Sequence, residues 1–372
     1  MRVVIVGGGV LGTMHAWHAV RRGHDVVQLE RETEARSASV RNFGLVWVGG
    51  RAAGAELATA VRARELWAEI GAAVPGIGFR ANGSLTVVRT AAELAVAEDV
   101  VARPDAAERG CTLLDADGVR AANPLIQGDI LGALHCARDA AVEPRVAQPA
   151  LRTALAATGR YTWLPGREVR DVATGLVRDD RNDRHEADVV LLCPGALLGG
   201  VIRDLAGDLP IRRVRLQMMQ TEPLPERLTT SVADADSFRY YPAYRGAALD
   251  ALNTTQPQPP VAATHAMQLL MVQRLDGSLT IGDTHGYTEP FPFDVEDKPY
   301  QHLADVAEAL LGRPLPPIRQ RWAGVYAQCT DTTKIVHRDE PTSGVWLITG
   351  PGGRGMTCAP AIAEQTMDEA NL

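Results

Sequence analysis

The feature that most constrains the fold is a glycine-rich turn that follows the first strand-like residues. RVVIV (2–6) is a short β-branched run, typical of a buried parallel strand, and GGGVLG (7–12) then matches the pattern G-x-G-x-x-G. TMHAWHAVRRG (13–23) continues as a helix, and HDVVQLE (24–30) is a second strand that ends in an acid, Glu30. This order predicts a β-α-β unit that holds a dinucleotide at the start of its helix.

Each position of this unit has a physical task. Gly7 permits the tight turn, Gly9 lets the backbone approach a pyrophosphate, and Gly12 lets the helix pack closely on the strand. The first helical N–H groups, at Val10 and Leu11, point at the phosphates, where the positive end of the helix dipole favours negative charge. Glu30 is expected to accept hydrogen bonds from a ribose hydroxyl.

Composition narrows the class of protein. The 372 residues suffice for two domains, or for one domain with a large insertion, and the net charge of −7 without a long basic run argues against a nucleic-acid surface. Five cysteines without a C-x-x-C pair argue against a disulfide framework and a metal site, and favour a reducing compartment. No apolar run reaches the roughly 20 residues of a membrane helix. We therefore expect a cytoplasmic protein with no metal and no membrane or nucleic-acid partner; its oligomeric state stays open.

A second glycine-rich turn lies near the other end of the chain. ITGPGGRGMTCAPAIAE (348–364) has four glycines within six positions and then an alanine-rich, helix-like stretch. An ordinary strand-to-helix turn accounts for one such glycine but not for four.

Six separated segments together resemble the D-amino-acid-oxidase-like flavoprotein superfamily, which includes glycine oxidase and monomeric sarcosine oxidase. They are ERETEARSASVRNFG (30–44), VEPRVAQPALRTALAATG (142–159), REVRDV (167–172), ADVVLLCPGAL (187–197), RWAGVYA (321–327) and GPGGRGMT (350–357). The resemblance implies an α/β plus α+β fold, in which a Rossmann-like FAD-binding domain carries an inserted substrate domain built on an antiparallel sheet. The expected FAD-binding domain is 1–45, 140–215 and 318–372, and the expected substrate domain is 46–139 and 216–317. A hairpin is expected at the turn Asp276-Gly277.

The resemblance implies FAD as the cofactor, with the first turn at the pyrophosphate and the last beside the isoalloxazine ring. Besides the residues of the first turn and Glu30, it implies cofactor contacts at Arg31, Ser37, Ser39, Asn42, Phe43, Gly44, Val169, Pro194, Gly195, Gly352, Gly353, Gly355 and Met356. Sarcosine oxidases attach flavin through a cysteine where this chain has Gly324, so we expect non-covalent FAD. They also carry an oxygen-activating lysine where this chain has Thr280, which leaves the electron acceptor open.

The expected reaction is oxidation of a small anionic amine to an imine and then to an aldehyde plus an amine or ammonia, with hydrogen peroxide formed if oxygen is the acceptor. The polar residues expected to face the substrate are Arg41, Tyr241, His285, Tyr326 and Arg354, whereas Tyr240 and Arg321 are assigned to structural contacts. No catalytic residue is assigned. The alternatives are a glycine, sarcosine or D-amino-acid oxidase, and a non-catalytic flavin-binding subunit.

A resemblance to one branch of the superfamily narrows the class of substrate that we expect. SVRNFG (39–44), IGDTHGY (281–287), RWAGVYA (321–327) and TGPGGRGMT (349–357) resemble the branch associated with aminophosphonate catabolism. This implies a substrate such as 2-aminoethylphosphonate or its N-methyl derivative. A phosphonate needs more than one donor, and because lysine occurs only twice in the chain, the expected anchors are arginine, backbone N–H groups or hydroxyls, with Arg354 and Arg41 as the candidates.

Overall fold

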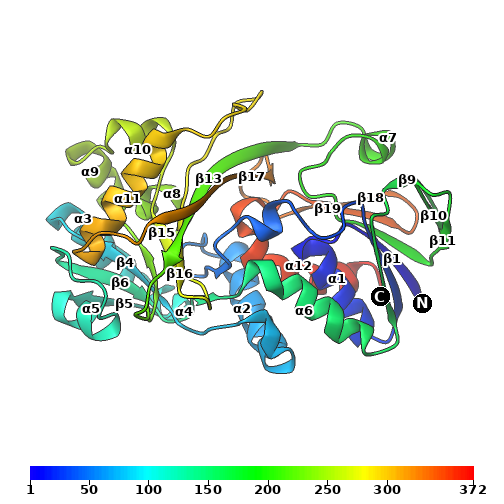
Figure 1. Ribbon diagram of the computed structural model, residues 1–372, viewed down its shortest axis with the longest axis horizontal. Helices are drawn as coiled ribbons and strands as arrows, with labels where there is room; N and C mark the ends of the chain where they lie inside the picture. Colours follow the sequence, from blue (N-terminus) through cyan, green and yellow to red (C-terminus); the bar gives the residue numbers. More distant parts are fainter.

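A computed structural model describes residues 1–372 as two packed units (Figure 1). The first unit, called here the parallel-sheet domain, is built on a six-stranded sheet in which only the edge strand β18 runs antiparallel to its neighbour. In sheet order its strands are β18 (His337–Thr342), β19 (Val345–Thr349), β12 (Val189–Leu192), β1 (Arg2–Val6), β2 (Asp25–Glu30) and β8 (Tyr161–Pro165).

The parallel-sheet domain has three layers, with the sheet in the middle, because the side chains of β1 point alternately to its two faces. Val3 and Ile5 point into a core shared with the helices, whereas Val4 packs into a second core on the opposite face, because successive strand residues face opposite sides. The helices are α1 (Val10–Arg21), α6 (Pro144–Ala156) and α12 (Gly355–Glu369). The opposite face is covered by α7 (Val201–Ala206) and a small antiparallel sheet of β9 (Val169–Ala173), β10 (Leu176–Asp179) and β11 (Arg184–Glu186).

The second unit, the antiparallel-sheet domain, is built on eight strands, of which only β14 and β4 pair in parallel. In sheet order they are β17 (Ile318–Cys329), β13 (Ile211–Pro223), β16 (Ser278–Gly282), β15 (Leu270–Gln273), β14 (Ser231–Ala233), β4 (Ser84–Val88), β6 (Gly132–Cys136) and β5 (Cys111–Asp115). The expected hairpin is confirmed, because β15 and β16 pair antiparallel around Asp276 and Gly277. A two-stranded ladder of β3 (Leu45–Val46) and β7 (Ala140–Ala141) links the two units.

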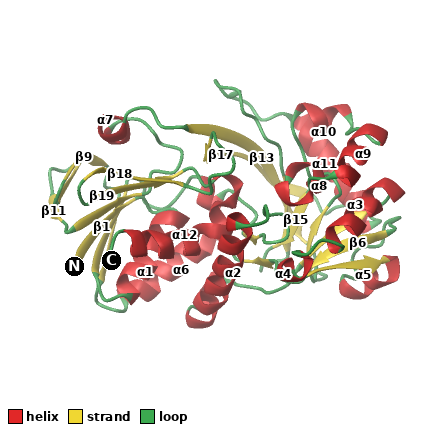
Figure 2. Ribbon diagram, turned by 180° about the vertical axis from the view of Figure 1, so that it is seen from behind, coloured by secondary structure: helices red, strands yellow, loops and turns green.

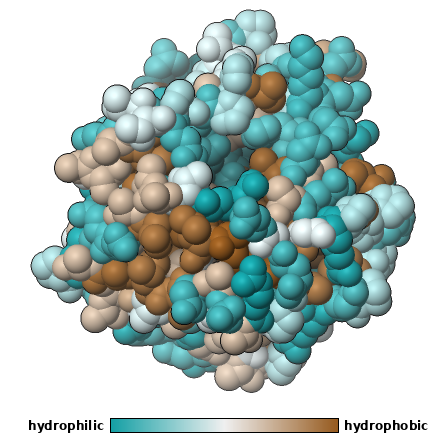
Figure 3. Space-filling model, turned by 90° about the vertical axis from the view of Figure 1, so that its left-hand side faces the viewer, coloured by the Kyte–Doolittle hydropathy of each residue, from teal (hydrophilic) through white to brown (hydrophobic).

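Helices cover both faces of the larger sheet. One face shares its core with α10 (Pro260–Thr264) and α11 (Asp297–Leu311), and the other with α3 (Ala91–Val101) and α9 (Ala247–Thr255). Short helices complete this domain: α4 (Ala106–Arg109), α5 (Ala116–Ala122) and α8 (Ser237–Tyr240). Its outer end shows a mostly hydrophilic surface with one hydrophobic area (Figure 3).

The longest strands, β13 and β17, pair from Ile211 opposite Cys329 to Thr221 opposite Ile318 and run from one domain into the other (Figures 1 and 2). The fold class expected from the sequence, a Rossmann-like domain with an antiparallel insertion, is therefore confirmed.

One expected domain boundary is wrong. Residues 46–77 were placed in the substrate domain, yet Val46, Val48 and α2 (Ala55–Ala73) share the core of the parallel-sheet domain. Helix α2 packs along α12, whose small residues, such as Ala359 and Ala363, allow a close approach. The sequence predicts that α2 has an apolar face, but it does not indicate which helix packs against that face.

No helix in the structure combines the length and the apolar character that crossing a membrane requires. The cytoplasmic location stays a prediction.

Candidate functional site: a cavity between the two glycine turns

A single cavity of ≈ 1180 Å³ lies between the two domains, and both glycine turns contribute to its wall. The structure brings most of the predicted site residues together there, from positions as far apart in the sequence as Gly7 and Met356. The predicted residues that line it are Gly7, Gly9, Val10, Leu11, Glu30, Arg31, Ser37, Ser39, Arg41, Asn42, Phe43, Val169, Pro194, Gly195, Tyr241, His285, Tyr326, Gly352, Gly353, Arg354, Gly355 and Met356.

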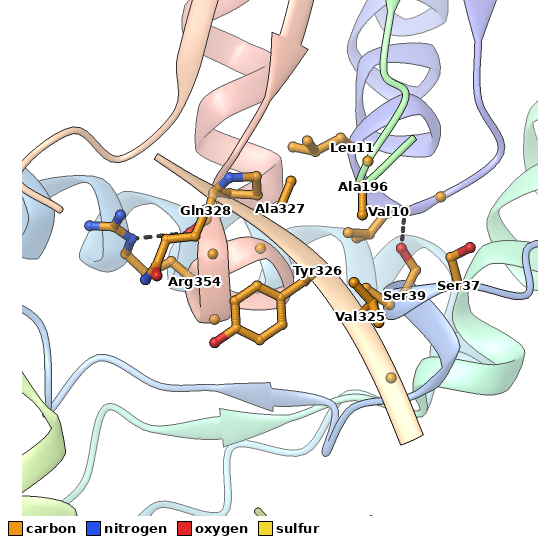
Figure 4. Close-up of a pocket in the computed structure, with 18 of the residues that line it drawn as sticks. Val10, Leu11, Ser37, Ser39, Ala196, Val325, Tyr326, Ala327, Gln328 and Arg354 are labelled. Atoms are coloured by element: carbon orange, nitrogen blue, oxygen red, sulfur yellow. Dashed lines mark hydrogen bonds between the residues drawn. The ribbon is translucent and has the colours of Figure 1, made fainter. Parts of the chain in front are cut away.

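The first turn has the features that a bound pyrophosphate requires. Gly7 adopts φ +114°, and a Cβ there would lie 2.4 Å from the carbonyl oxygen of Cys193, so only glycine fits. The N–H groups of Gly9 and Leu11 have no partner within the chain, whereas the Val10 N–H donates to Ser39 Oγ at 2.9 Å (Figure 4). Free donors at the start of α1 suit the phosphates of FAD.

Glu30 is held in place at the end of β2. Its Oε2 accepts from the Gly8 N–H at 2.7 Å, and its Oε1 accepts from the Glu32 N–H at 3.0 Å. A carboxylate oxygen has more than one lone pair, so both oxygens can still accept from a ribose.

Gly12 and Gly44 do not line the cavity, which corrects their assignment to direct cofactor contacts. A Cβ at Gly12 would lie 2.0 Å from the Gly7 carbonyl oxygen, so Gly12 sets the approach of α1 to β1. Gly44 adopts φ +69°, and a Cβ there would lie 2.1 Å from the Val142 carbonyl oxygen. Both glycines shape the wall without forming its surface.

Substitution at Gly9 tests the pyrophosphate site without disturbing the fold. Gly9 has φ −72°, which alanine adopts freely, and the atom nearest to a Cβ there is the movable Ser39 Oγ at 3.0 Å. We expect Gly9→Ala to weaken FAD binding by at least about tenfold, because the methyl group blocks close approach of the backbone to the pyrophosphate. Flavin occupancy and dissociation constant measure this. Gly76→Ala, whose Cβ would make only an ordinary contact at 3.4 Å, is the control; equal FAD affinity in both variants would contradict the assignment.

The second turn begins α12 beside a group of tyrosines. The N–H groups of Gly352 and Gly353 have no partner within the chain, and α12 starts two residues later with its positive dipole end. A Cβ at Gly353 would lie 3.8 Å from the hydroxyl oxygen of Tyr240 and 3.9 Å from that of Tyr326. The turn expected beside the flavin ring therefore contacts the part of the cavity expected to hold substrate.

Aromatic side chains form that part of the wall. Tyr240 and Tyr326 place their hydroxyl oxygens 3.4 Å apart, and Tyr326 reaches the cavity from β17 (Figure 4). The Tyr240 ring stacks on His285 with 4.2 Å between ring centroids and meets the Tyr241 ring edge-on. Burial raises the pKa of Tyr240 and of Tyr326 well above the usual value, so both phenols stay protonated. Tyr240, assigned from the sequence to a structural contact, therefore also lines the cavity.

Arg354 does not present a free guanidinium group, contrary to its expected role as an anion anchor. Its Nη1 lies 3.3 Å from Glu56 Oε2 and 3.1 Å from the Thr332 carbonyl oxygen. Its Nη2 donates to the Lys334 carbonyl at 2.8 Å, and its Nε donates to the Pro351 carbonyl at 3.1 Å. The side chain thus fastens α2 and the loop after β17 to the glycine turn.

This arrangement predicts a stability defect for Arg354→Met. Arg354 is buried, and its loss would remove the nearest partner of the buried Glu56 and leave the Thr332 and Lys334 carbonyls without their donor. Breaking a buried pair costs about 3–5 kcal/mol, so the free energy of unfolding should fall by about that amount. Denaturant unfolding measures it. Unchanged stability, with a loss of activity confined to anionic substrates, would restore Arg354 as the anchor.

Arg51 lines the same end of the cavity and was missed from the sequence. It is 4% exposed; its Nε donates to the Trp47 carbonyl at 2.8 Å and its Nη2 to Thr357 Oγ1 at 3.2 Å. Its Nη1 lies 3.8 Å from Glu56 Oε1, beyond hydrogen-bond distance. Because almost all the basic residues of this chain are arginines, the sequence did not distinguish Arg51 from the others as a site residue.

Arg41 lies on another side of the cavity and is exposed. Its Nε donates to the Arg36 carbonyl at 2.8 Å and its Nη1 to the Ala323 carbonyl at 2.7 Å, so no carboxylate compensates its charge. Arg321 does not line this cavity; it lies over the Tyr300 ring, 5.3 Å from its centroid, as a structural contact.

The structure shows the surroundings of Thr280 and Gly324, the two positions at which this chain differs from the sarcosine oxidases. Thr280 is buried outside the cavity, and its Oγ1 accepts from Arg274 Nε at 2.8 Å; burial lowers the pKa of Arg274 to about 10. Arg274 also donates to the carbonyl of Phe43, so a buried cation lies behind the Phe43 turn. Gly324 lines the cavity, whereas Cys329 does not. Non-covalent attachment stays a prediction.

Comparisons with known proteins agree with this geometry. Residues 2–369 match the family described as FAD dependent oxidoreductase. Glycine oxidase from Bacillus cereus superposes with a TM-score of 0.78 at 17% identity, covering 100% of this chain and 94% of that one. Iminodiacetate oxidase from Chelativorans sp. BNC1 gives a TM-score of 0.76 at 18% identity, covering 98% and 93%.

A curated relative matches over a shorter stretch. The tRNA 5-methylaminomethyl-2-thiouridine biosynthesis bifunctional protein MnmC of Maricaulis maris is 33% identical over 94 residues, which cover 25% of this chain and 15% of that protein. The structural likenesses, all below 25% identity, show the fold. Because the family match spans nearly the whole chain, the protein belongs to the FAD dependent oxidoreductase family, and its cofactor is FAD.

Proposed function

We propose that this oxidoreductase oxidises a small anionic amine to an imine, which water converts to an aldehyde plus an amine or ammonia. We further propose an aminophosphonate, such as 2-aminoethylphosphonate or its N-methyl derivative, as the substrate. The observation that supports this most is the position of Gly353, in the glycine turn expected at the flavin ring: a Cβ there would lie 3.8 and 3.9 Å from the Tyr240 and Tyr326 hydroxyls. FAD, when bound, supplies a two-electron acceptor. The residues of this chain bind and orient the amine and exclude water from it.

The charge of the cavity favours an anionic ligand. Eleven arginines and six carboxylates line it, in a chain whose net charge is −7. The pyrophosphate of FAD would neutralise part of this excess of arginines. The charge that bears on the substrate is therefore the charge at the end of the cavity that holds the tyrosines and Arg51. There Arg51 and Arg354 share the carboxylate of Glu56, Asp283 adds a second carboxylate, and the guanidinium of Arg245 makes no hydrogen bond within the chain. The surplus positive charge at this end suits an acid group on the substrate.

Arg51 is the best-placed anchor for that group. Its Nη1 lacks a hydrogen-bond partner, and its side chain is held by Trp47 and Thr357 in a largely dry site. Its guanidinium lies 5.8 Å from the centroid of Tyr241, within the aromatic wall. A phosphonate carries up to two charges and three acceptor oxygens, so a planar, always charged donor group suits it. Arg41 and Arg245 are the second donors we propose.

An amino-acid oxidase is the main alternative. Glycine and iminodiacetate, after which two of the structurally similar oxidases are named, are themselves small anionic amines, so a carboxylate could occupy the place proposed for the phosphonate. A non-catalytic flavin-binding subunit is the third reading. The buried aromatic wall beside the glycine turn favours an enzyme, because such a subunit does not need a lined pocket there.

A product assay on the FAD-loaded enzyme distinguishes the three. The panel is 2-aminoethylphosphonate, its N-methyl derivative, glycine, sarcosine, iminodiacetate and D-alanine, each with oxygen or with an artificial dye as electron acceptor. We expect the highest kcat/KM with an aminophosphonate, with the aldehyde appearing in step with ammonia or methylamine. A far higher kcat/KM with glycine, sarcosine or another amino acid would identify an amino-acid oxidase. No turnover with any amine and either acceptor would favour the non-catalytic subunit.

A further inference from the structure

His285 offers one open ring nitrogen to the cavity. Its Nδ1 lies 3.0 Å from the Ala266 carbonyl oxygen, and because a carbonyl only accepts, the Nδ1 carries the hydrogen. The neutral ring therefore has its lone pair on Nε2. This atom has no hydrogen bond within the chain, and it lies 3.7 Å from Asp283 Oδ2. His285 is 5% exposed and lines the cavity, so Nε2 is a proton acceptor in a nearly dry site.

Asp283 has few partners besides the side chain of Gln268. It is 5% exposed, and its Oδ1 has no hydrogen-bond partner. No arginine or lysine pairs with it; the one cationic partner in reach is His285. Burial raises the pKa of the Asp283 carboxyl above its usual value, which reflects the cost of an uncompensated charge. A proton that arrives on His285 would relieve this cost by turning an isolated carboxylate into an ion pair.

The other groups around the ring do not compete for this proton. Tyr240 and Tyr326 stay protonated. The Tyr287 ring centroid lies 6.5 Å from that of His285, and the Arg212 guanidinium lies 4.6 Å from the Tyr287 centroid. His265 does not line the cavity; its Nε2 lies 3.6 Å from Glu296 Oε2. Glu56, the other carboxylate at this end of the cavity, faces Arg51 and Arg354.

The geometry points to the Asp283–His285 pair as the acceptor of the proton that the substrate's ammonium group must lose before oxidation. This rests on the proposed function, because it requires an amine substrate. One N–H bond of the ammonium breaks, its electron pair stays on nitrogen, and a new N–H bond forms at His285 Nε2. The charge of the pair changes from −1 to zero. With FAD bound, the freed lone pair would be available to form the C=N bond as the adjacent carbon gives up a hydride, and FAD would supply the two-electron acceptor.

The pH dependence of anaerobic flavin reduction tests the pair. In wild type the reduction rate should rise with pH as the pair loses its proton. His285→Gln should bind FAD normally and be reduced about a hundredfold more slowly at neutral pH, the usual size of a lost proton transfer. The deficit should shrink as pH approaches the amine's own pKa, because free amine then arrives unprotonated. His265→Gln, a histidine outside the cavity, is the control and should match wild type.

Asp283→Asn is the second variant and decides the case if His285→Gln folds poorly. Loss of the carboxylate removes the charge that favours the imidazolium, so the acid limb of the profile should move to lower pH. If wild type is reduced by amines but both variants follow its profile, or lose the same factor at every pH, the proton assignment fails while the proposed function stands. If no amine reduces wild type, the proposed function fails, and the proton assignment fails with it.

Discussion

Arg51→Met should keep FAD and lose kcat/KM on an aminophosphonate by about ten- to a hundredfold. The reason is the loss of a charge-assisted contact to the substrate's acid group, which costs about 1.5–3 kcal/mol. On a neutral amine of similar size, such as 1-aminopropane, the loss should be much smaller, because that substrate has no anion to anchor. Steady-state kinetics of both substrates, measured on protein with equal flavin content, gives the comparison.

Two controls make the Arg51 result specific. Arg64→Met removes an arginine of α2 that lies over the Phe79 ring, outside the cavity, and kcat/KM for both substrates should stay unchanged. Arg51→Lys keeps the charge but not the planar fork, so it should recover only part of the loss. Equal losses on the charged and the neutral substrate in Arg51→Met would remove Arg51 from the anion site.

Gly353→Ala should lower the rate of flavin reduction by about a hundredfold while the apoprotein stays as stable as wild type. The added methyl group meets only the Tyr240 and Tyr326 hydroxyls, at 3.8 and 3.9 Å, which are ordinary contacts. It would, however, project into the space shared by the flavin ring and the amine. A displacement of about 1 Å between reacting groups costs about a hundredfold in rate.

The control for this change is an equally small substitution nearby. At Gly286 a Cβ would lie 3.6 Å from the Arg215 carbonyl oxygen, outside the cavity, so Gly286→Ala should behave as wild type. Thermal unfolding of the apoproteins and anaerobic reduction of the loaded enzymes separate stability from rate. A Gly353→Ala enzyme that is reduced as fast as wild type would show that Gly353 does not border the reacting groups.

The cofactor-binding residues could be predicted from the sequence because their roles depend on neighbouring residues in the chain. The first turn was predictable because strand, glycines, helix and Glu30 follow one another within 30 residues, and each requirement is satisfied by neighbours in the chain. The second turn was predictable from four glycines before α12, although its place opposite the first turn rested on the resemblance to known flavoproteins. The hairpin at Gly277 followed from turn chemistry alone.

The substrate side was harder because its roles depend on contacts between distant segments. The sequence assigned Arg354 to the substrate site and gave Arg51 no role, yet Arg354 donates to three carbonyls beside Glu56 and Arg51 keeps a free Nη1. Their difference arises from the position of α2, which the sequence did not place. Asp283 and His285 were visible two positions apart in IGDTHGY, but the isolation of the Asp283 carboxylate appears only in the fold.

The most direct measurement is the absorption spectrum of the bound flavin during anaerobic titration with 2-aminoethylphosphonate or its N-methyl derivative. If the cavity joins the flavin to a site for a small anionic amine, the oxidised flavin should bleach fully, with one equivalent of aldehyde formed for each flavin reduced. A flavin that dithionite reduces, but that stays oxidised with every anionic amine tested, would contradict the proposed function.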